Sequence, residues 1–161
     1  MNNLLRYRWP MNERAWLDEQ EMAAWQGFLR SSHRVAHHLE QQLKEDAQLS
    51  HPQYELLVLL ADASAGAIRM TELAEAAITS KSGLTYQVGQ LEKRGLVRRR
   101  SCPTDVRGVL AELTEQGRQV LEKAAPGHVA AVRAVLIDHL DREELEVLAR
   151  ALGRVAARPG H

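Results

Sequence analysis

Residues 91–114 read LEKRGLVRRRSCPTDVRGVLAELT, and this stretch decides the fold that the sequence predicts. Gly95 is expected to end a helix, because glycine adopts the positive φ that a helix C-terminus favours. Residues 96–100 predict a strand, residues 101–108 with their Pro and Gly predict a loop, and residues 109–113 predict the returning strand. We therefore expect a helix followed by an arginine-rich β-hairpin.

The helix before this hairpin has one apolar face and one polar face. It is predicted over residues 81–94, with Thr79 and Ser80 as a polar N-terminal cap. Its apolar face consists of Leu84, Val88 and Leu91. The helical periodicity then places the following residues on the outward face: Ser82, Thr85, Tyr86, Gly89 and Lys93. Lys81 and Ser82 also lie at the N-terminal end, where backbone N–H groups and the helix dipole favour phosphate.

The remaining patterns predict a mainly α-helical chain. Before the hairpin we expect a long amphipathic helix over residues 13–47, a helix after a capping box at Ser50–Gln53, a small strand at residues 68–70 and a short helix capped by Thr71. After it we expect a helix from Thr114 through Ile137, bent at Pro126-Gly127, and a last helix after a capping box at Asp141–Glu144. This order is that of a winged helix-turn-helix, whose second helix fits the major groove of DNA while the hairpin reaches a neighbouring minor groove.

Composition excludes several classes of protein. The 161 residues are 45% apolar, which excludes wholesale disorder and allows one domain with a core of Leu, Val and Ala. The single cysteine excludes an internal disulfide and any multi-cysteine metal site. No run approaches the 18 or so apolar residues of a membrane helix, and the N-terminus lacks a secretory apolar region. We therefore expect a cytoplasmic protein.

The formal net charge of +0 conceals an uneven distribution of charge. Residues 81–107 contain seven basic and two acidic residues, a net charge of +5, so the rest of the chain carries −5. A local basic segment of this kind is typical of a surface that binds a polyanion. A merely solvated arginine strand is the alternative that charge alone leaves open.

Four short motifs occur together along the chain. They are Arg69-Met-Thr-Glu-Leu-Ala74, Ser82-Gly-Leu-Thr85, Leu91-Glu-Lys-Arg-Gly-Leu-Val97, and Asp105-Val-Arg-Gly108 followed by Leu113-Thr114. With them the sequence resembles the multiple-antibiotic-resistance regulator (MarR) family, from about Trp25 to the C-terminus. The resemblance implies one domain over residues 1–161, a winged helix-turn-helix DNA-binding part over 50–113, and dimerisation helices over 13–47 and 114–157.

The family resemblance also implies a function. It implies a homodimer that binds a pseudo-palindromic operator in double-stranded DNA, most often as a repressor, and that a small phenolic-type ligand can release. A winged-helix module for protein interaction or assembly, without a specific operator, is the alternative function. No catalytic motif is present, so we expect no enzyme.

The resemblance carries over DNA-binding positions residue by residue. They are Lys81, Ser82, Gly83, Thr85 and Tyr86 in the recognition helix, Arg107 in the wing, and Asp105, which is expected to orient Arg107. The shared strand face of Arg98 and Arg100 makes both candidate phosphate contacts. Tyr86 and Gly89 depart from the common pattern, where a basic residue and an aspartate are frequent. These departures bear on the operator sequence rather than on DNA binding itself.

Other candidate residues have weaker patterns. His33, His37 and His38 follow helical spacing, but no metal-ligand pattern joins them, so we predict no metal and no cofactor. Cys102 is a candidate oxidation sensor because nearby arginines lower the pKa of a thiol, although the family's sensors carry theirs near the N-terminus. Trp16 is a candidate contact in the ligand cleft that the resemblance implies, and a core or dimer-interface role is the alternative.

Overall fold

The computed structural model describes residues 16–63, 66–77, 79–102 and 105–157, without the side chains of residues 106 and 107. The chain divides into two compact units, Met1–His33 and Arg34–His161, and helix α1 (Glu19–Ala47) begins in the first and ends in the second. The second unit then contains α2 (His51–Ala61), β1 (Ala67–Arg69), α3 (Met70–Ala76), α4 (Lys81–Lys93), β2 (Val97–Cys102), β3 (Asp105–Leu113), α5 (Glu115–Val135), a 3₁₀ turn (Ile137–His139) and α6 (Arg142–Ala156). The predicted class, mainly α with a small β-hairpin, is confirmed.

Most predicted helix starts are confirmed by side chains that cap the first turn. Ser50 accepts a hydrogen bond from the N–H of Gln53 while the Gln53 side chain accepts from the N–H of Ser50. Asp141 and Glu144 form the same reciprocal capping box at α6. Ser80 and Thr114 cap α4 and α5. Capping is local in sequence, so these starts could be predicted without knowing the fold.

Two predicted helix starts are wrong. Helix α3 begins at Met70, with Arg69 as its N-cap and no capping side chain, so Thr71 lies inside the first turn. The reason is that Arg69 still pairs with Leu110, and the strand passes directly into the helix. Helix α1 begins at Glu19, because Asp18 and Glu21 exchange backbone-to-carboxylate hydrogen bonds of 2.9 and 2.8 Å. Residues 13–15 lie outside the described residues.

The sheet has three antiparallel strands in the order β1-β3-β2. Ser101 pairs with Val109, whereas Cys102 pairs with Asp105, so an irregularity separates the two pairs. The predicted loop over residues 101–108 is therefore wrong, because both strands extend toward the end of the hairpin. Proline and glycine mark bulges as well as loops, and the sequence does not distinguish the two.

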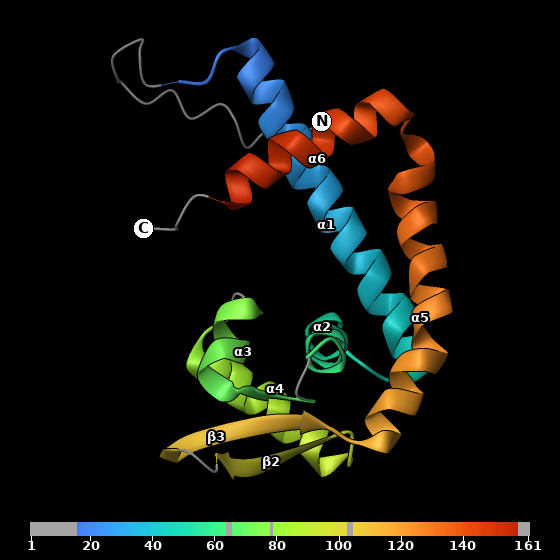
Figure 1. Cartoon of the computed structure of the whole chain (residues 1–161). Coiled ribbons are helices and arrows are strands. Elements are labelled where there is room, and N and C mark those ends of the chain that lie inside the picture. The colour runs from blue at the N-terminus through green and yellow to red at the C-terminus, as the bar shows by residue number, and fades with distance from the viewer. Residues whose placement is uncertain (1–15, 64–65, 78, 103–104, 158–161) are drawn as a thin grey trace. The chain divides into compact units, whose positions relative to one another are not determined.

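The core of the second unit lies between the helices and the sheet. Figure 1 shows α2, α3 and α4 on one side of β2 and β3. The largest fully buried side chains are Leu43, Leu49, Leu57, Leu60, Leu73, Leu84, Val88, Leu91, Leu96 and Val97. They include the predicted apolar face of α4, which fixes the direction of its polar face.

Helix α5 differs from its prediction at its C-terminal end. Helix α5 continues through Pro126 and ends at Val135, followed by a 3₁₀ turn, so it stops short of the predicted Ile137. Helix α6 has no buried residue. Among the described residues, no helix is long and apolar enough to cross a membrane.

Candidate nucleic-acid interface

The polar face of α4 is exposed as predicted. Lys81, Ser82, Thr85 and Tyr86 are exposed, and Gly83 is half-buried. The N–H of Gly83 donates to Ser80 Oγ at 3.1 Å, which leaves the first turn capped by a side chain from outside the helix. The hydroxyl of Thr85 donates to the carbonyl of Lys81 at 2.8 Å. These four exposed side chains and the Gly83 backbone therefore form one surface at the N-terminal half of α4.

Arg98 and Arg100 lie on one face of β2, as predicted, and both contact Glu112 of β3. Arg98 Nη2 is 2.9 Å from Glu112 Oε1, and Arg100 Nε is 3.1 Å from Glu112 Oε2. The hydrogen bond from Arg98 is the main cause that holds the pKa of Glu112 below its usual value. Since one carboxylate serves two arginines, this cluster keeps a net positive charge.

Arg99 points to the other side of the strand and contacts Glu92 of α4. Its Nη2 lies 2.5 Å from Glu92 Oε2, and its backbone N–H donates to Glu92 Oε1 at 3.1 Å. The hydrogen bond from the Arg99 side chain lowers the pKa of Glu92 below its usual value. Arg99 therefore connects the wing to α4.

The surface formed by the basic segment, residues 81–107, is less positive than its count of charged residues suggests. Arg94, which contributes to the +5, donates to the carbonyl oxygens of Ala47 and Gln48 at the end of α1. Glu112 lies outside the counted residues 81–107 but contacts two of the arginines. The uneven charge is real, but part of it supports the fold.

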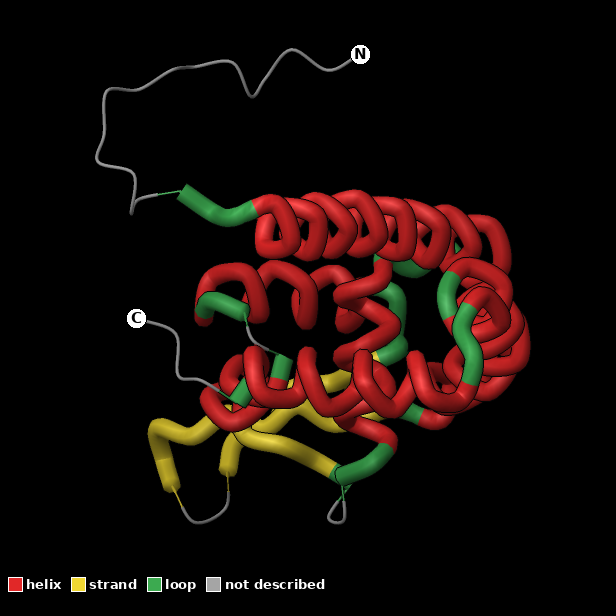
Figure 2. Tube along the Cα trace, turned by 90° about the horizontal axis from the view of Figure 1, so that it is seen from above, coloured by secondary structure: helices red, strands yellow, loops and turns green. Residues whose placement is uncertain are grey.

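The outer end of the wing carries a contact that sequence reasoning missed. Asp105 Oδ2 accepts a 2.8 Å hydrogen bond from Arg69 Nη1. The side chain of Arg107 lies outside the described part of the structure, so its expected pairing with Asp105 stays a prediction. Figure 2 shows the outer ends of the β2 and β3 strands extending past the neighbouring helices. Arg69 belongs to one of the motifs that carry the family resemblance, but no local pattern links it to Asp105.

The weaker candidates differ in their exposure to solvent. Cys102 is buried at the end of β2, while His33, His37 and His38 are exposed on α1. Within the described ranges, no three His, Cys, Asp or Glu side chains are grouped so that they could hold a metal ion. Trp16 is 57% exposed.

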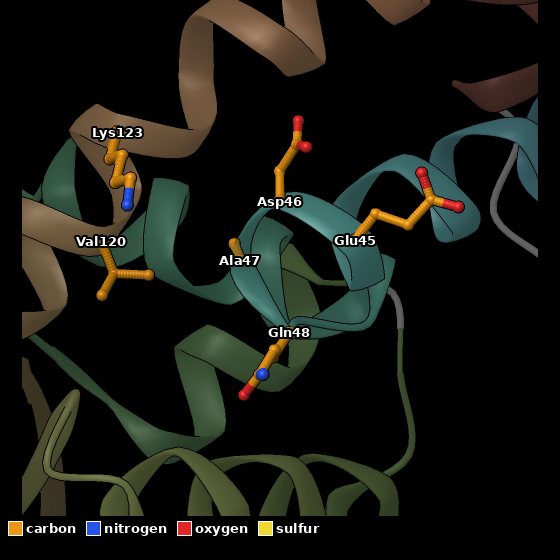
Figure 3. Close-up of a pocket in the computed structure, with 6 residues that line it drawn as sticks. All are labelled: Glu45, Asp46, Ala47, Gln48, Val120 and Lys123. Carbon is orange, nitrogen blue, oxygen red and sulfur yellow. The ribbon is translucent and has the colours of Figure 1, made fainter.

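A shallow pocket of about 260 Å³ lies between the end of α1 and α5. Glu45, Asp46, Ala47 and Gln48 line one side, and Val120 and Lys123 of α5 line the other (Figure 3). Its walls carry the two carboxylates of Glu45 and Asp46, the ammonium group of Lys123 and the apolar side chains of Ala47 and Val120.

A second feature that the sequence did not reveal is an aromatic cluster around His128 of α5. The ring of His128 lies 4.4 Å from that of Tyr54 and 5.8 Å from that of His51, centroid to centroid. Its Nδ1 is 3.3 Å from Gln42 Oε1 of α1. Burial, and to a lesser extent His51, lowers the pKa of His128, and burial raises the pKa of Tyr54. The cluster joins α1, α2 and α5.

Comparison with known proteins agrees with this architecture. Residues 49–109 match the MarR family. A solved structure of Sco3205, a MarR family transcriptional regulator from Streptomyces coelicolor in complex with DNA, is 41% identical and superposes with a TM-score of 0.86 over 90% of this chain and 96% of that one. AbsC from the same organism, also of the MarR family, is 40% identical, with a TM-score of 0.84 over 88% and 95% of the two chains.

A curated relative is more distant. The HTH-type transcriptional repressor YetL of Bacillus subtilis is 34% identical over 105 residues. That match covers 65% of this chain and 62% of YetL, so the chain spans less than two thirds of this relative.

The chain belongs to the MarR family of transcriptional regulators. The exposed face of α4 beside a three-stranded wing is the winged helix-turn-helix arrangement that the sequence predicted. The relatives named above are transcriptional regulators, in agreement with the expectation that the chain is not an enzyme.

Proposed function

We propose that the protein is a homodimeric, sequence-specific DNA-binding repressor. In this proposal Lys81, Ser82, Gly83, Thr85 and Tyr86 enter the major groove, and Arg107, oriented by Asp105, enters the adjacent minor groove. Arg98 and Arg100 contact phosphates. The protein then acts in the cytoplasm.

One observation carries this proposal: the polar face of α4 is exposed while its apolar face is fully buried. Leu84, Val88 and Leu91 are at most 1% exposed, so the orientation of the helix in the domain is fixed. Tyr86, on the opposite face, is 63% exposed. A helix held in this way has the width and the exposed polar groups that the major groove admits.

The relatives support the two parts of the proposal that concern DNA and repression. Sco3205 was solved in complex with DNA, and YetL is named a repressor.

The proposed dimer is supported by apolar surface on α6. Val147, Leu152 and Val155 are between 41% and 69% exposed, on an amphipathic helix without a buried residue. Such a helix gains its stability by burying that face against a partner. A second copy of the chain is the partner that a two-fold operator requires.

Release by a small phenolic-type ligand, with Trp16 as a contact, is the remaining part of the proposal. It rests on the family resemblance. Quenching of tryptophan fluorescence by salicylate in the wild-type protein, absent in Trp16→Phe, is the expected result. Equal quenching in both proteins removes Trp16 from this role.

Selection of genomic fragments by the purified protein tests the DNA-binding function. We expect enrichment of an inverted repeat whose half-sites lie about one helical turn apart, ~10 bp. A variant that combines Lys81→Ala and Tyr86→Ala serves as the matched control, because both side chains are exposed and their loss spares the core. This variant should select no repeat while its free energy of unfolding stays unchanged.

Two results would oppose the proposal. Failure of the wild-type protein to enrich any repeat would favour the interaction-module alternative. A monomer in sedimentation equilibrium at micromolar concentration would contradict the dimer.

A further inference from the structure

Helix α1 ends in a sharp turn whose carbonyl groups face the end of α4. Gln48 adopts a φ of 55°, in the left-handed region, and the N–H of Leu49 donates to the carbonyl of Leu43 at 3.2 Å. The last carbonyls of a helix have no regular intrahelical donor and carry the negative end of the helix dipole. The carbonyl oxygens of Ala47 and Gln48 therefore need donors from elsewhere.

Arg94 supplies those donors from the C-cap position of α4. Its Nη1 donates to the carbonyl of Gln48 at 2.7 Å, and its Nη2 donates to the carbonyl of Ala47 at 3.1 Å. A planar guanidinium that donates two bonds fixes orientation as well as distance, and a cation at a helix C-terminus is favourable. One side chain thus joins the end of α1 to the end of α4.

The residues after Arg94 are joined in turn to the start of α5. The hydroxyl of Thr114 donates to the carbonyl of Gly95 at 2.7 Å, and its backbone N–H donates to the carbonyl of Leu96 at 3.1 Å. The same hydroxyl accepts from the N–H of Gly117 and so caps α5. Residues 94–96 therefore contact the C-terminal end of α1 and the N-terminal end of α5.

We infer that Arg94 is a positioning residue for DNA recognition, which fixes the C-terminal end of α4 against the end of α1 without contacting DNA. The inference rests on the proposed function, in which α4 reads the operator. Helix α4 has 13 residues and is therefore ~20 Å long. A tilt of about 10° at its C-terminal end moves its N-terminal end by roughly 3 Å, far more than a hydrogen bond to a base tolerates.

Operator titrations from 50 to 300 mM salt test the inference with three variants. Arg94→Met removes both hydrogen bonds, and Arg94→Lys keeps the charge and can restore one of them. Lys93→Met is the matched control, since it removes the same charge from an adjacent exposed residue. Hydrogen exchange of the α4 amides in the free protein is measured alongside, with the α2 amides as an internal reference.

A positioning role predicts a specific combination of results. Arg94→Met should lose at least ten-fold in operator affinity with the wild-type salt slope, and Arg94→Lys should recover part of that loss. A phosphate contact would instead lower the salt slope by about one, which would overturn the inference. Wild-type affinity in Arg94→Met would overturn it as well.

Hydrogen exchange separates failure of the inference from failure of the proposed function. If the wild-type protein binds no operator, the exchange data still test the coupling between the ends of α1 and α4. Exchange in the Arg94 variants that is faster than in the wild type for the α4 amides, but not for the α2 amides, supports this coupling. Exchange of the α4 amides at the wild-type rate refutes it. If Arg94→Met does not fold, Arg94→Lys decides between these outcomes.

Discussion

Arg69 and Asp105, separated by 36 positions in sequence, are joined by a 2.8 Å hydrogen bond between Nη1 and Oδ2. Arg69 ends β1 and is the N-cap of α3, whereas Asp105 begins β3 at the outer end of the hairpin. The contact therefore connects the wing to the first helix of the helix-turn-helix. Its two side chains are 34% and 44% exposed, so we expect it to orient the wing more than it stabilises the fold.

Replacing Arg69 by Met should weaken operator binding about five-fold, because the wing loses its hydrogen bond to Asp105. The free energy of unfolding should stay close to that of the wild type, as for other exposed ion pairs. Fluorescence anisotropy with labelled operator and urea denaturation measure the two quantities. Glu72→Gln is the control, since it removes the other carboxylate near Arg69, at 3.9 Å, and leaves Asp105 in place. Equal affinities of Arg69→Met and wild type would show that this hydrogen bond has no part in binding.

Replacing Glu112 by Gln should strengthen binding to DNA of any sequence. The carboxylate competes with phosphate for Arg98 and Arg100, and its loss leaves both guanidinium groups free for the backbone of DNA. We expect a steeper dependence of log K on log salt, by up to about two phosphate contacts. Glu92→Gln removes the same charge beside Arg99 and is the control. A slope that does not differ between the two variants would place Arg98 and Arg100 away from DNA.

Replacing Gly117 by Ala should destabilise the protein strongly. A Cβ at this position would overlap the carbonyl oxygen of Leu96 and lie 2.7 Å from Leu113 Cδ1. Overpacking of this kind costs about 1–3 kcal/mol. Gly89→Ala is the matched comparison inside another helix, since its Cβ would meet no atom within 4 Å, and it should gain up to ~1 kcal/mol from helix propensity. Thermal denaturation distinguishes the two, and a stable Gly117→Ala protein would mean that α5 can shift away from Leu96.

Stability should decrease as the pH falls below about 6.5, in part through His128. Its pKa is lower in the folded protein than in the unfolded chain, so the unfolded state binds more protons between the two values. In this range the free energy of unfolding therefore decreases as the pH decreases. It is fully recovered once the pH is above the pKa of His128 in the unfolded chain.

The variant His128→Gln tests this assignment. It should flatten the dependence of unfolding free energy on pH below about pH 6.5. His37→Gln, at an exposed position of α1, should retain it. An unchanged profile in His128→Gln would assign the pH dependence to other groups.

The features that the sequence predicted correctly depend on neighbouring residues. Ser80 and Thr114 cap their helices through atoms three residues away, and Gly95 adopts the positive φ of 71° that ends α4. Leu84 and Val88 are buried because the periodicity of the helix places them on one face. Each of these features depends on residues within a single helical turn or a single helix.

The features that the sequence missed depend on contacts between distant segments. Arg94 is 46 positions from Gln48, and Glu112 is 14 positions from Arg98. A count of charges along the chain gives every arginine the same weight. In the folded protein Arg94 donates to carbonyl oxygens at the end of α1, and Arg98 donates to the carboxylate of Glu112. Likewise, a strand that runs directly into a helix at Arg69 removes the need for the predicted cap at Thr71.

The crowding around Gly108 has a consequence for how such a regulator can change its target. A Cβ at Gly108 would lie 2.9 Å from Cys102 Cβ and 3.0 Å from Arg69 Nη1, so close packing, rather than a turn, requires glycine here. The packing at the outer end of the wing is thereby specified by Gly108, Cys102 and Arg69. In the proposed mode of DNA binding, exposed side chains elsewhere on the wing can then change with the operator while this packing keeps the register of β2 and β3, which makes the wing a part of the protein where new specificity can evolve without loss of the fold.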